Sequence, residues 1–124
     1  MDLAAEEIVE RICKLPAEFY AVRTKSIVQL VGESSLRDHL ALLTVSTIER
    51  YLEAHPEDIQ PWFLWSADKR VTSGWFFTRR ADSFAVEFYP DGEGLSFSEP
   101  ERACAEFVVR EVTALLAIHP RAKN

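Results

Sequence analysis

The sequence predicts a single α+β domain with an N-terminal helical half, a three-stranded antiparallel β-meander and a C-terminal helix packed on the sheet. Three observations lead to this prediction. Apolar residues recur at three- and four-residue spacing in the first half, alternate from Gly74 to Ser98, and return to helical spacing after Pro100. The 124 residues contain no internal repeat and no linker, so we expect one domain over residues 1–124.

The first helices are indicated by the residues at their ends. Asp2 is placed to cap a helix over residues 3–14, and Pro16 ends that helix or begins a short second one. The stretch KSIVQLVG, residues 25–32, predicts a further helix, which Gly32 should terminate in a C-terminal cap.

Two serines divide the region that follows. Ser35 precedes a predicted helix over about residues 36–44. Ser46, with Glu49 three residues later, forms a capping box that predicts a separate helix over about residues 47–55.

A further helix is expected after the next proline. His55 ends the preceding helix, because the residue before a proline is pushed away from helical geometry. Asp58 is then placed to cap a new helix, and Pro61 is tolerated in its first turn, where no intrahelical donor is needed. The apolar residues that fill this helix are Trp62, Phe63, Leu64 and Trp65.

Alternating residues predict the three strands, in GWFFTRR, FAVEFYP and the short LSFS. The segments RADS and PDGEG are the expected hairpin turns. In the first strand, one face is expected to carry Trp75, Phe77 and Arg79. In the second strand, one face is expected to carry Phe84, Val86 and Phe88.

The last helix opens at Ser98 or Glu99, with Pro100 in its first turn. We expect it to end at His119, which precedes Pro120. Its predicted buried face consists of Cys104, Phe107, Val108, Val112, Leu115 and Leu116.

Motifs for common enzymatic chemistry are missing from the sequence. It contains no P-loop, no G-x-G-x-x-G, no G-x-S-x-G and no H-E-x-x-H. The three histidines are isolated, and Cys13 and Cys104 lack the C-x-x-C spacing of a zinc site. We therefore expect no metal, no cofactor and no enzymatic activity, and we expect both cysteines to be buried free thiols.

The carboxylates offer no obvious catalytic pair. Neighbouring acids, such as Glu57 and Asp58, are expected at helix starts or on solvated faces. Glu87 is the exception, because it is an acid within an apolar strand. Alternation predicts a solvated position for Glu87, across from Arg79 or Arg80.

The formal net charge is −6, which argues against nucleic acid as the main partner. The charge is uneven: residues 69–80 carry four basic residues and no acid, and the rest carries 10 basic and 20 acidic residues. No apolar run reaches the length of a membrane span, and the N-terminus lacks the pattern of a secretory signal. We therefore expect a cytoplasmic protein that does not bind membranes.

The basic segment is also the candidate interaction site, because arginine and large aromatic residues dominate many protein interfaces. The candidate interaction residues are Trp65, Lys69, Arg70, Trp75, Arg79 and Arg80. A plainer alternative is that the two tryptophans join the halves of the core and that the basic residues pair with the acidic helices.

Several motifs resemble those of a family of small uncharacterised bacterial proteins, which carry a domain of unknown function. The motifs are W-S-x-x-K-R and S-G-W-[YF]-F in HPEDIQPWFLWSADKRVTSGWFF, and A-C-A-x-F-[IV]-x-x-E in EPERACAEFVVREV. The segments EFYP and LPAEFYAVRTKS are also similar to the family. Pro61 departs from the family pattern. The resemblance implies no catalytic residues and a relation to immunity proteins that neutralise toxins.

Two functions follow as hypotheses. The first is a non-enzymatic protein-binding module of the toxin-immunity kind, whose acidic surface suits a basic partner. The alternative is a small ligand-binding domain or enzyme, with a pocket between sheet and helices that uses Arg70, Glu87 and Tyr89. A self-associating structural domain is a third possibility, and the sequence does not predict an oligomeric state.

Overall fold

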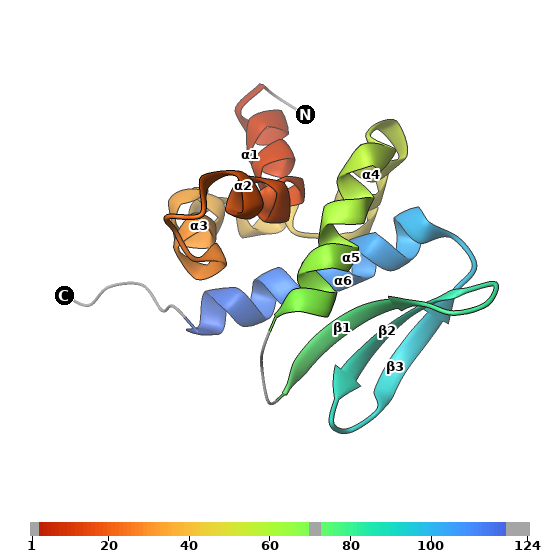
Figure 1. Cartoon of the computed structure of the whole chain (residues 1–124). Helices are drawn as coiled ribbons and strands as arrows, with labels where there is room; N and C mark the ends of the chain where they lie inside the picture. The colour runs from red at the N-terminus through yellow and green to blue at the C-terminus, as the bar shows by residue number, and fades with distance from the viewer. Residues whose placement is uncertain (1–2, 70–72, 119–124) are drawn as a thin grey trace.

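A computed structural model describes residues 3–69 and 73–118 and confirms the α+β arrangement (Figure 1). The elements are α1 (Leu3–Cys13), α2 (Leu15–Val22), α3 (Ile27–Glu33), the 3₁₀ helix η1 (Leu36–Leu42), α4 (Val45–Ala54), the 3₁₀ helix η2 (Pro56–Asp58), α5 (Ile59–Asp68), β1 (Gly74–Arg79), β2 (Phe84–Tyr89), β3 (Glu93–Phe97) and α6 (Pro100–Ile118). The three strands form an antiparallel sheet in the order β1-β2-β3. The predicted end of the last helix, at His119, lies outside the described residues.

The end of α3 differs from the prediction. Gly32 lies inside the helix, which continues to Glu33 and is capped by Ser34. The Ser34 hydroxyl donates to the Val31 carbonyl at 2.7 Å and accepts the Leu36 N–H at 3.2 Å. The buried Ser34 therefore bonds to free backbone groups at the end of the helix, which was the role predicted for a cap at Gly32.

The two serines expected to cap the next helices do not do so. Ser35 adopts a left-handed conformation (φ 69°) without a side-chain cap, and the following η1 is interrupted at His39, so no α-helix forms over residues 36–44. Thr44 rather than Ser46 caps α4, because its extended backbone lets its hydroxyl accept the N–H of Thr47 at 3.3 Å. The helix consequently starts before the predicted capping box.

The alternation of side chains along the strands is as predicted, and the structure adds the register between them. Phe77 of β1 lies opposite Val86 of β2. The Phe77 ring stacks on Phe63 of α5 at 3.9 Å and on Phe107 of α6 at 5.6 Å. This face of the sheet is therefore the one that the helices cover.

The longest helix, α6, joins the two halves of the molecule. It runs behind α5 in Figure 1 and contacts α3, α4, α5 and each strand. Its predicted stripe is buried from Cys104 to Leu115, whereas Leu116 is only partly buried. Trp62 of α5 is fully buried and meets Phe107 edge-on at 5.9 Å. The main core thus lies where α5 and α6 cross above the sheet.

Candidate functional site

Two of the six predicted interaction residues, Trp65 and Lys69, face the interior from the end of α5. Lys69 Nζ lies 2.8 Å from Glu111 Oε1, and Trp65 Nε1 donates to Glu111 Oε2 at 2.7 Å. The side chains of Lys69 and Glu111 are only 4% and 5% exposed. The ammonium also lies over the rings of Phe76 (4.7 Å) and Phe107 (5.4 Å). The Lys69 side chain is therefore a buried structural cation, whereas the sequence predicted it as a candidate interaction residue.

Burial dominates the electrostatics of this pair. It lowers the pKa of Lys69 from its ordinary value of 10.5, and the carboxylate of Glu111 opposes the shift. Sequence reasoning missed Glu111, although a signal was available. Glu111 lies between Val108 and Leu115 on the apolar stripe of α6, where an acid is expected to need a buried partner.

Trp75 lies between the sheet and α6, as the plainer alternative proposed. Its ring meets Phe88 edge-on at 5.1 Å and carries the guanidinium of Arg110 at 4.6 Å. Arg110 is in turn held by Glu106, one helical turn away, at 2.7 Å. This tryptophan contributes to packing and is only partly accessible.

The remaining candidates lie at the far end of β1. Arg79 is exposed and lies over the rings of Phe63 (5.8 Å) and Phe84 (5.6 Å). Arg80 forms an ion pair with Glu87 at 2.7 Å, which confirms the predicted place of that acid. Arg70 lies outside the described residues. The five described candidates are therefore divided between the two ends of β1 and do not form one patch.

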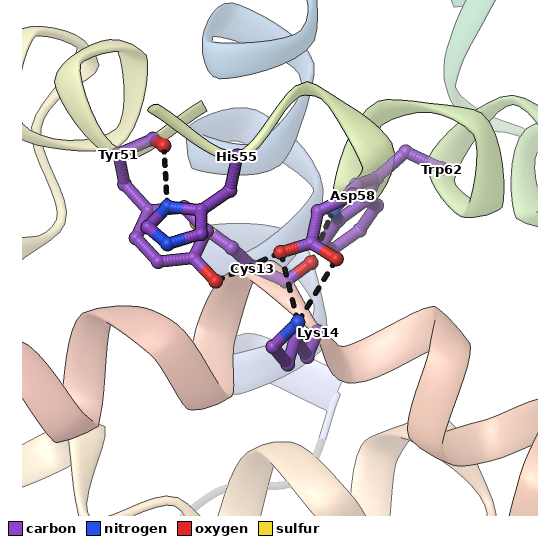
Figure 2. A network of polar contacts seen from close by, with 6 residues as sticks. All are labelled: Cys13, Lys14, Tyr51, His55, Asp58 and Trp62. Carbon is purple, nitrogen blue, oxygen red and sulfur yellow. Dashed lines mark hydrogen bonds and ion pairs between the residues drawn. The ribbon is translucent and has the colours of Figure 1, made fainter. Parts of the chain in front are cut away.

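A second buried carboxylate lies at the start of α5 (Figure 2). Both oxygens of Asp58 accept from Lys14 Nζ, at 3.1 and 3.2 Å, and the Tyr51 hydroxyl donates to Oδ2 at 2.8 Å. Asp58 makes no side-chain cap to α5, contrary to the prediction, because these two donors take its oxygens. Its burial also contradicts the expected solvated position.

Asp58 affects the pKa values of the two side chains that donate to it. The hydrogen bond to Asp58 raises the pKa of Lys14. Burial, followed by the same kind of hydrogen bond, raises the pKa of Tyr51. The Tyr51 ring also stacks on His55 at 4.2 Å. In these protonation states the network is fully satisfied, and it ties α1 and α4 to α5.

Three of the surface hollows lined by described residues are candidate binding sites. A groove of about 590 Å³ lies between α2, α3, α5 and α6, and its rim includes Phe19, Tyr20, Arg23 and Asp68. A hollow of about 540 Å³ lies between α1 and α4 and includes Glu6, Glu10, Arg50, Tyr51 and His55. A shallower hollow of about 340 Å³ on the sheet is lined by Phe76, Glu87, Phe88, Tyr89, Pro90 and Gly92.

The sheet hollow bears on the alternative pocket. Glu87 and Tyr89 both line it, but they lie on the sheet face opposite to Phe77 and the helices. Arg70, the third residue of that hypothesis, is outside the described part. The two residues therefore come together, but not in a pocket between sheet and helices.

The two edges of the sheet differ, because α5 packs against β1 whereas β3 is exposed. On β1, the Phe77 N–H donates to Ser66 Oγ of α5 at 2.8 Å, so a helix satisfies that edge. On β3, every residue from Glu93 to Ser96 is exposed, and Leu95 is 44% exposed. Edge strands of this kind are open to pairing with another chain.

The described residues offer little reactive chemistry. Burial raises the pKa of both thiols, Cys13 and Cys104, which keeps them protonated and poorly nucleophilic. Within residues 3–69 and 73–118, no group of three potential metal ligands occurs, and every buried side-chain nitrogen or oxygen has a hydrogen-bond partner. No helix in the same part of the chain is long and apolar enough to cross a bilayer.

Comparison with known proteins finds no counterpart: no protein-family model, no curated protein and no solved structure matches the chain. The family resemblance of the motifs stays a prediction.

Proposed function

We propose that this chain is a non-enzymatic protein-binding module of the toxin-immunity kind, which acts in the cytoplasm. The observation that carries the proposal is a contrast within the molecule. The buried charges of the interior are bound to one another, whereas the edge of β3 is exposed and acidic. The edge of β3 is therefore a place where polar backbone and side-chain groups are available to a partner.

The state of the carboxylates supports a function without catalysis. A general acid or base must reach its substrate and must be free to change protonation. Asp58 and Glu111 are the buried carboxylates of the described chain, and each is held by a lysine and an aromatic donor. Glu111 lines the groove between α2, α3, α5 and α6, but both of its oxygens already accept hydrogen bonds there. Groups bound in this way stabilise the fold.

The charge of the surface supports a cationic partner. The net charge of −6 attracts a basic protein over a long range and speeds their encounter, more at low ionic strength than at high. An immunity protein must capture its toxin quickly, so an acidic body suits this task.

Co-expression with products of neighbouring genes tests the proposal. We expect one of them to stop cell growth, this chain to restore growth, and the two to form a stable complex in size-exclusion chromatography. The variant Phe77→Ala removes a buried ring and should lower the free energy of unfolding by about 3–5 kcal/mol. We expect it to lose the protection because it loses the fold. A neighbourhood without any toxic or binding product would contradict the proposal.

The groove between α2, α3, α5 and α6 supports a second candidate, a small-molecule binding domain. Tyr20 at its rim donates to Asp68 at 2.7 Å, and burial followed by this bond raises the pKa of Tyr20 to about 12. Aromatic walls with a few fixed polar groups are typical of ligand pockets. A thermal-shift screen with metabolites tests this candidate, and Tyr20→Phe should remove any stabilisation that arises in the groove.

A further inference from the structure

We infer that the outer edge of β3 binds an extended polypeptide segment that carries lysine or arginine, by adding it to the sheet as a fourth strand. The inference rests on the proposed function, because it names the chemistry of the partner and the place where it docks. Strand addition obtains its affinity from main-chain hydrogen bonds and its specificity from alternate side chains.

The hydrogen bond at the other edge sets the register of the whole sheet. In antiparallel strands, residue pairs alternate between those that exchange backbone hydrogen bonds and those that do not. The Phe77 N–H donates to Ser66, outside the sheet, so Phe77 and Val86 are a pair without mutual bonds. The backbone groups of Val86 therefore point toward β3.

The same alternation identifies the free groups of β3. Leu95 lies opposite Val86, so its backbone groups point back to β2. Those of its neighbours, Gly94 and Ser96, consequently point away from the sheet. Within the described part of the chain, no element pairs with this side of β3. The outer edge thus presents two N–H and two C=O groups with the spacing of a strand.

The side chains along β3 leave room for an added strand. Gly94 lies close to β2: a Cβ there would be 2.5 Å from the Val86 carbonyl oxygen and 2.6 Å from Glu87 Cγ. Glycine is therefore required for pairing, and its lack of a side chain leaves space on the open face. On the covered face, the exposed Leu95 offers an apolar contact to a neighbouring strand.

Charge selects the kind of segment. Residues 90–101 contain Asp91, Glu93, Glu99 and Glu101 and no lysine or arginine. At the opposite edge, β1 contains Arg79 and no acid, and Arg80 follows it directly. The β3 edge therefore favours a cationic strand over a second copy of itself, which carries the same acidic residues.

Alternation predicts a pattern for the partner. Glu93, Leu95 and Phe97 share the covered face. An antiparallel segment then meets Phe97 first, Leu95 second and Glu93 third. It should read apolar-x-apolar-x-basic, with a further basic residue two positions later, near Asp91.

A capped peptide of this pattern, Thr-Val-Thr-Val-Thr-Lys-Thr-Lys, is the probe. We expect saturable NMR shifts at Gly94, Leu95 and Ser96 in the ¹⁵N-labelled full chain, and slower hydrogen exchange of the Gly94 and Ser96 amides. Ser96→Pro removes an outward N–H and keeps the hydrogen bonds between β2 and β3. It should lower the affinity for the peptide by about tenfold or more. Ser96→Ala, which keeps the N–H, is its matched control and should bind like the unmodified chain.

A charge pair keeps the test decisive if the proline variant does not fold. Glu93→Lys should weaken the peptide severalfold and flatten its salt dependence, whereas Glu53→Lys on α4 changes the net charge equally and should leave binding unchanged. A peptide with glutamate in place of both lysines should bind more weakly than the probe.

Several results would overturn the inference. They are shifts that map to the groove, equal binding by Ser96→Pro and Ser96→Ala, no binding at all, or dimerisation of the free chain that Ser96→Pro abolishes, which would make a second copy the occupant. A toxic neighbour still neutralised by Ser96→Pro and Glu93→Lys would leave the proposed function standing and remove this inference alone.

Discussion

The two buried carboxylates, Asp58 and Glu111, accept hydrogen bonds from the same kinds of side chain, but their lysine partners differ in exposure to water. Each binds one lysine and one aromatic donor, Tyr51 or Trp65. The lysine on Asp58 has a side chain that is 40% exposed, whereas the lysine on Glu111 is 4% exposed. We therefore expect the exposure of the lysine, rather than the contact itself, to decide how much each pair contributes to the free energy of unfolding.

The lysine pKa values express this difference. The hydrogen bond to Asp58 raises the pKa of Lys14, which keeps most of its hydration. Burial lowers the pKa of Lys69 although Glu111 is equally close. Lys14 can therefore return to water when its partner is lost, and Lys69 cannot.

Both pairs hold the same helix. Asp58 directly precedes α5 and Lys69 directly follows it. Their partners come from the junction of α1 and α2 and from α6, 44 and 42 residues away. An acid at the start and a base at the end also suit the dipole of α5. The pairs thus fix both ends of the helix that covers the edge of β1.

The largest expected effect comes from neutral isosteres of the two acids. Glu111→Gln leaves a buried, unpaired ammonium and should cost about 3–5 kcal/mol of the free energy of unfolding. Asp58→Asn keeps an acceptor for Tyr51 and releases Lys14 to water, so it should cost about 1 kcal/mol. Urea denaturation of both variants measures the difference.

A second substitution sharpens this comparison. Lys69→Met in the Glu111→Gln background should recover most of the loss, because it removes the unpaired charge. Lys14→Met in the Asp58→Asn background should recover nothing. Equal losses for the two acids, or no recovery by Lys69→Met, would show that the two pairs are equivalent.

A smaller effect is expected when the aromatic donors are removed. Trp65→Phe leaves Glu111 Oε2 without its N–H donor in a site with little access to water, and should cost about 1–3 kcal/mol. Tyr51→Phe leaves Asp58 with both contacts to Lys14, and should cost about 1 kcal/mol or less. Thermal denaturation gives the order of the two variants, and a larger loss for Tyr51→Phe would reverse the comparison.

The smallest effect is a difference in pH dependence. Because the pKa of Lys69 is lowered in the folded state, the unfolded chain binds more protons just below 10.5, and this contribution to stability rises with pH there. The raised pKa of Lys14 contributes stability that is complete below 10.5 and is lost as the pH rises above it.

Urea midpoints from about pH 8.5 to about pH 11 measure both signs. Relative to the unmodified chain, Lys69→Met should remove a contribution to stability that rises with pH, and Lys14→Met should remove one that falls with pH. Most other groups that titrate in this range are common to all three proteins and cancel in the differences. Cys13 is an exception, because burial raises its pKa and Lys14 opposes that shift, so a Cys13→Ala background is used for all three proteins. The same sign for both variants would contradict the assigned surroundings.

The candidate site shows where sequence reasoning stopped. Lys69 was predicted as an interaction residue because basic and large aromatic residues are interleaved in its segment. Its buried partner lies in another helix, and no local pattern links the two. Glu87 was predicted near Arg79 or Arg80, because a short hairpin keeps the two strands together, and the structure shows that Arg80 is the partner.

The helix ends show the same limit. His55 before Pro56 ends α4 as predicted, because that restriction is steric and acts within two residues. Gly32 and Ser46 are chemically suitable caps that the chain does not use, since Ser34 and Thr44 meet the same need in their tertiary places. Capping rules therefore predict a boundary but not the residue that makes it.

By itself, the sequence determined the α+β class, the strands with their two faces and the buried stripe of α6. These features depend on periods of two and 3.6 residues, which neighbouring side chains impose directly. Only the tertiary structure decided which acids are buried, which lysine loses its water and which edge of the sheet stays open. The first two outcomes depend on residues more than 40 positions apart, which the packing of the helices brings together. The third depends on the docking of α5 against β1, where Ser66 accepts the Phe77 N–H.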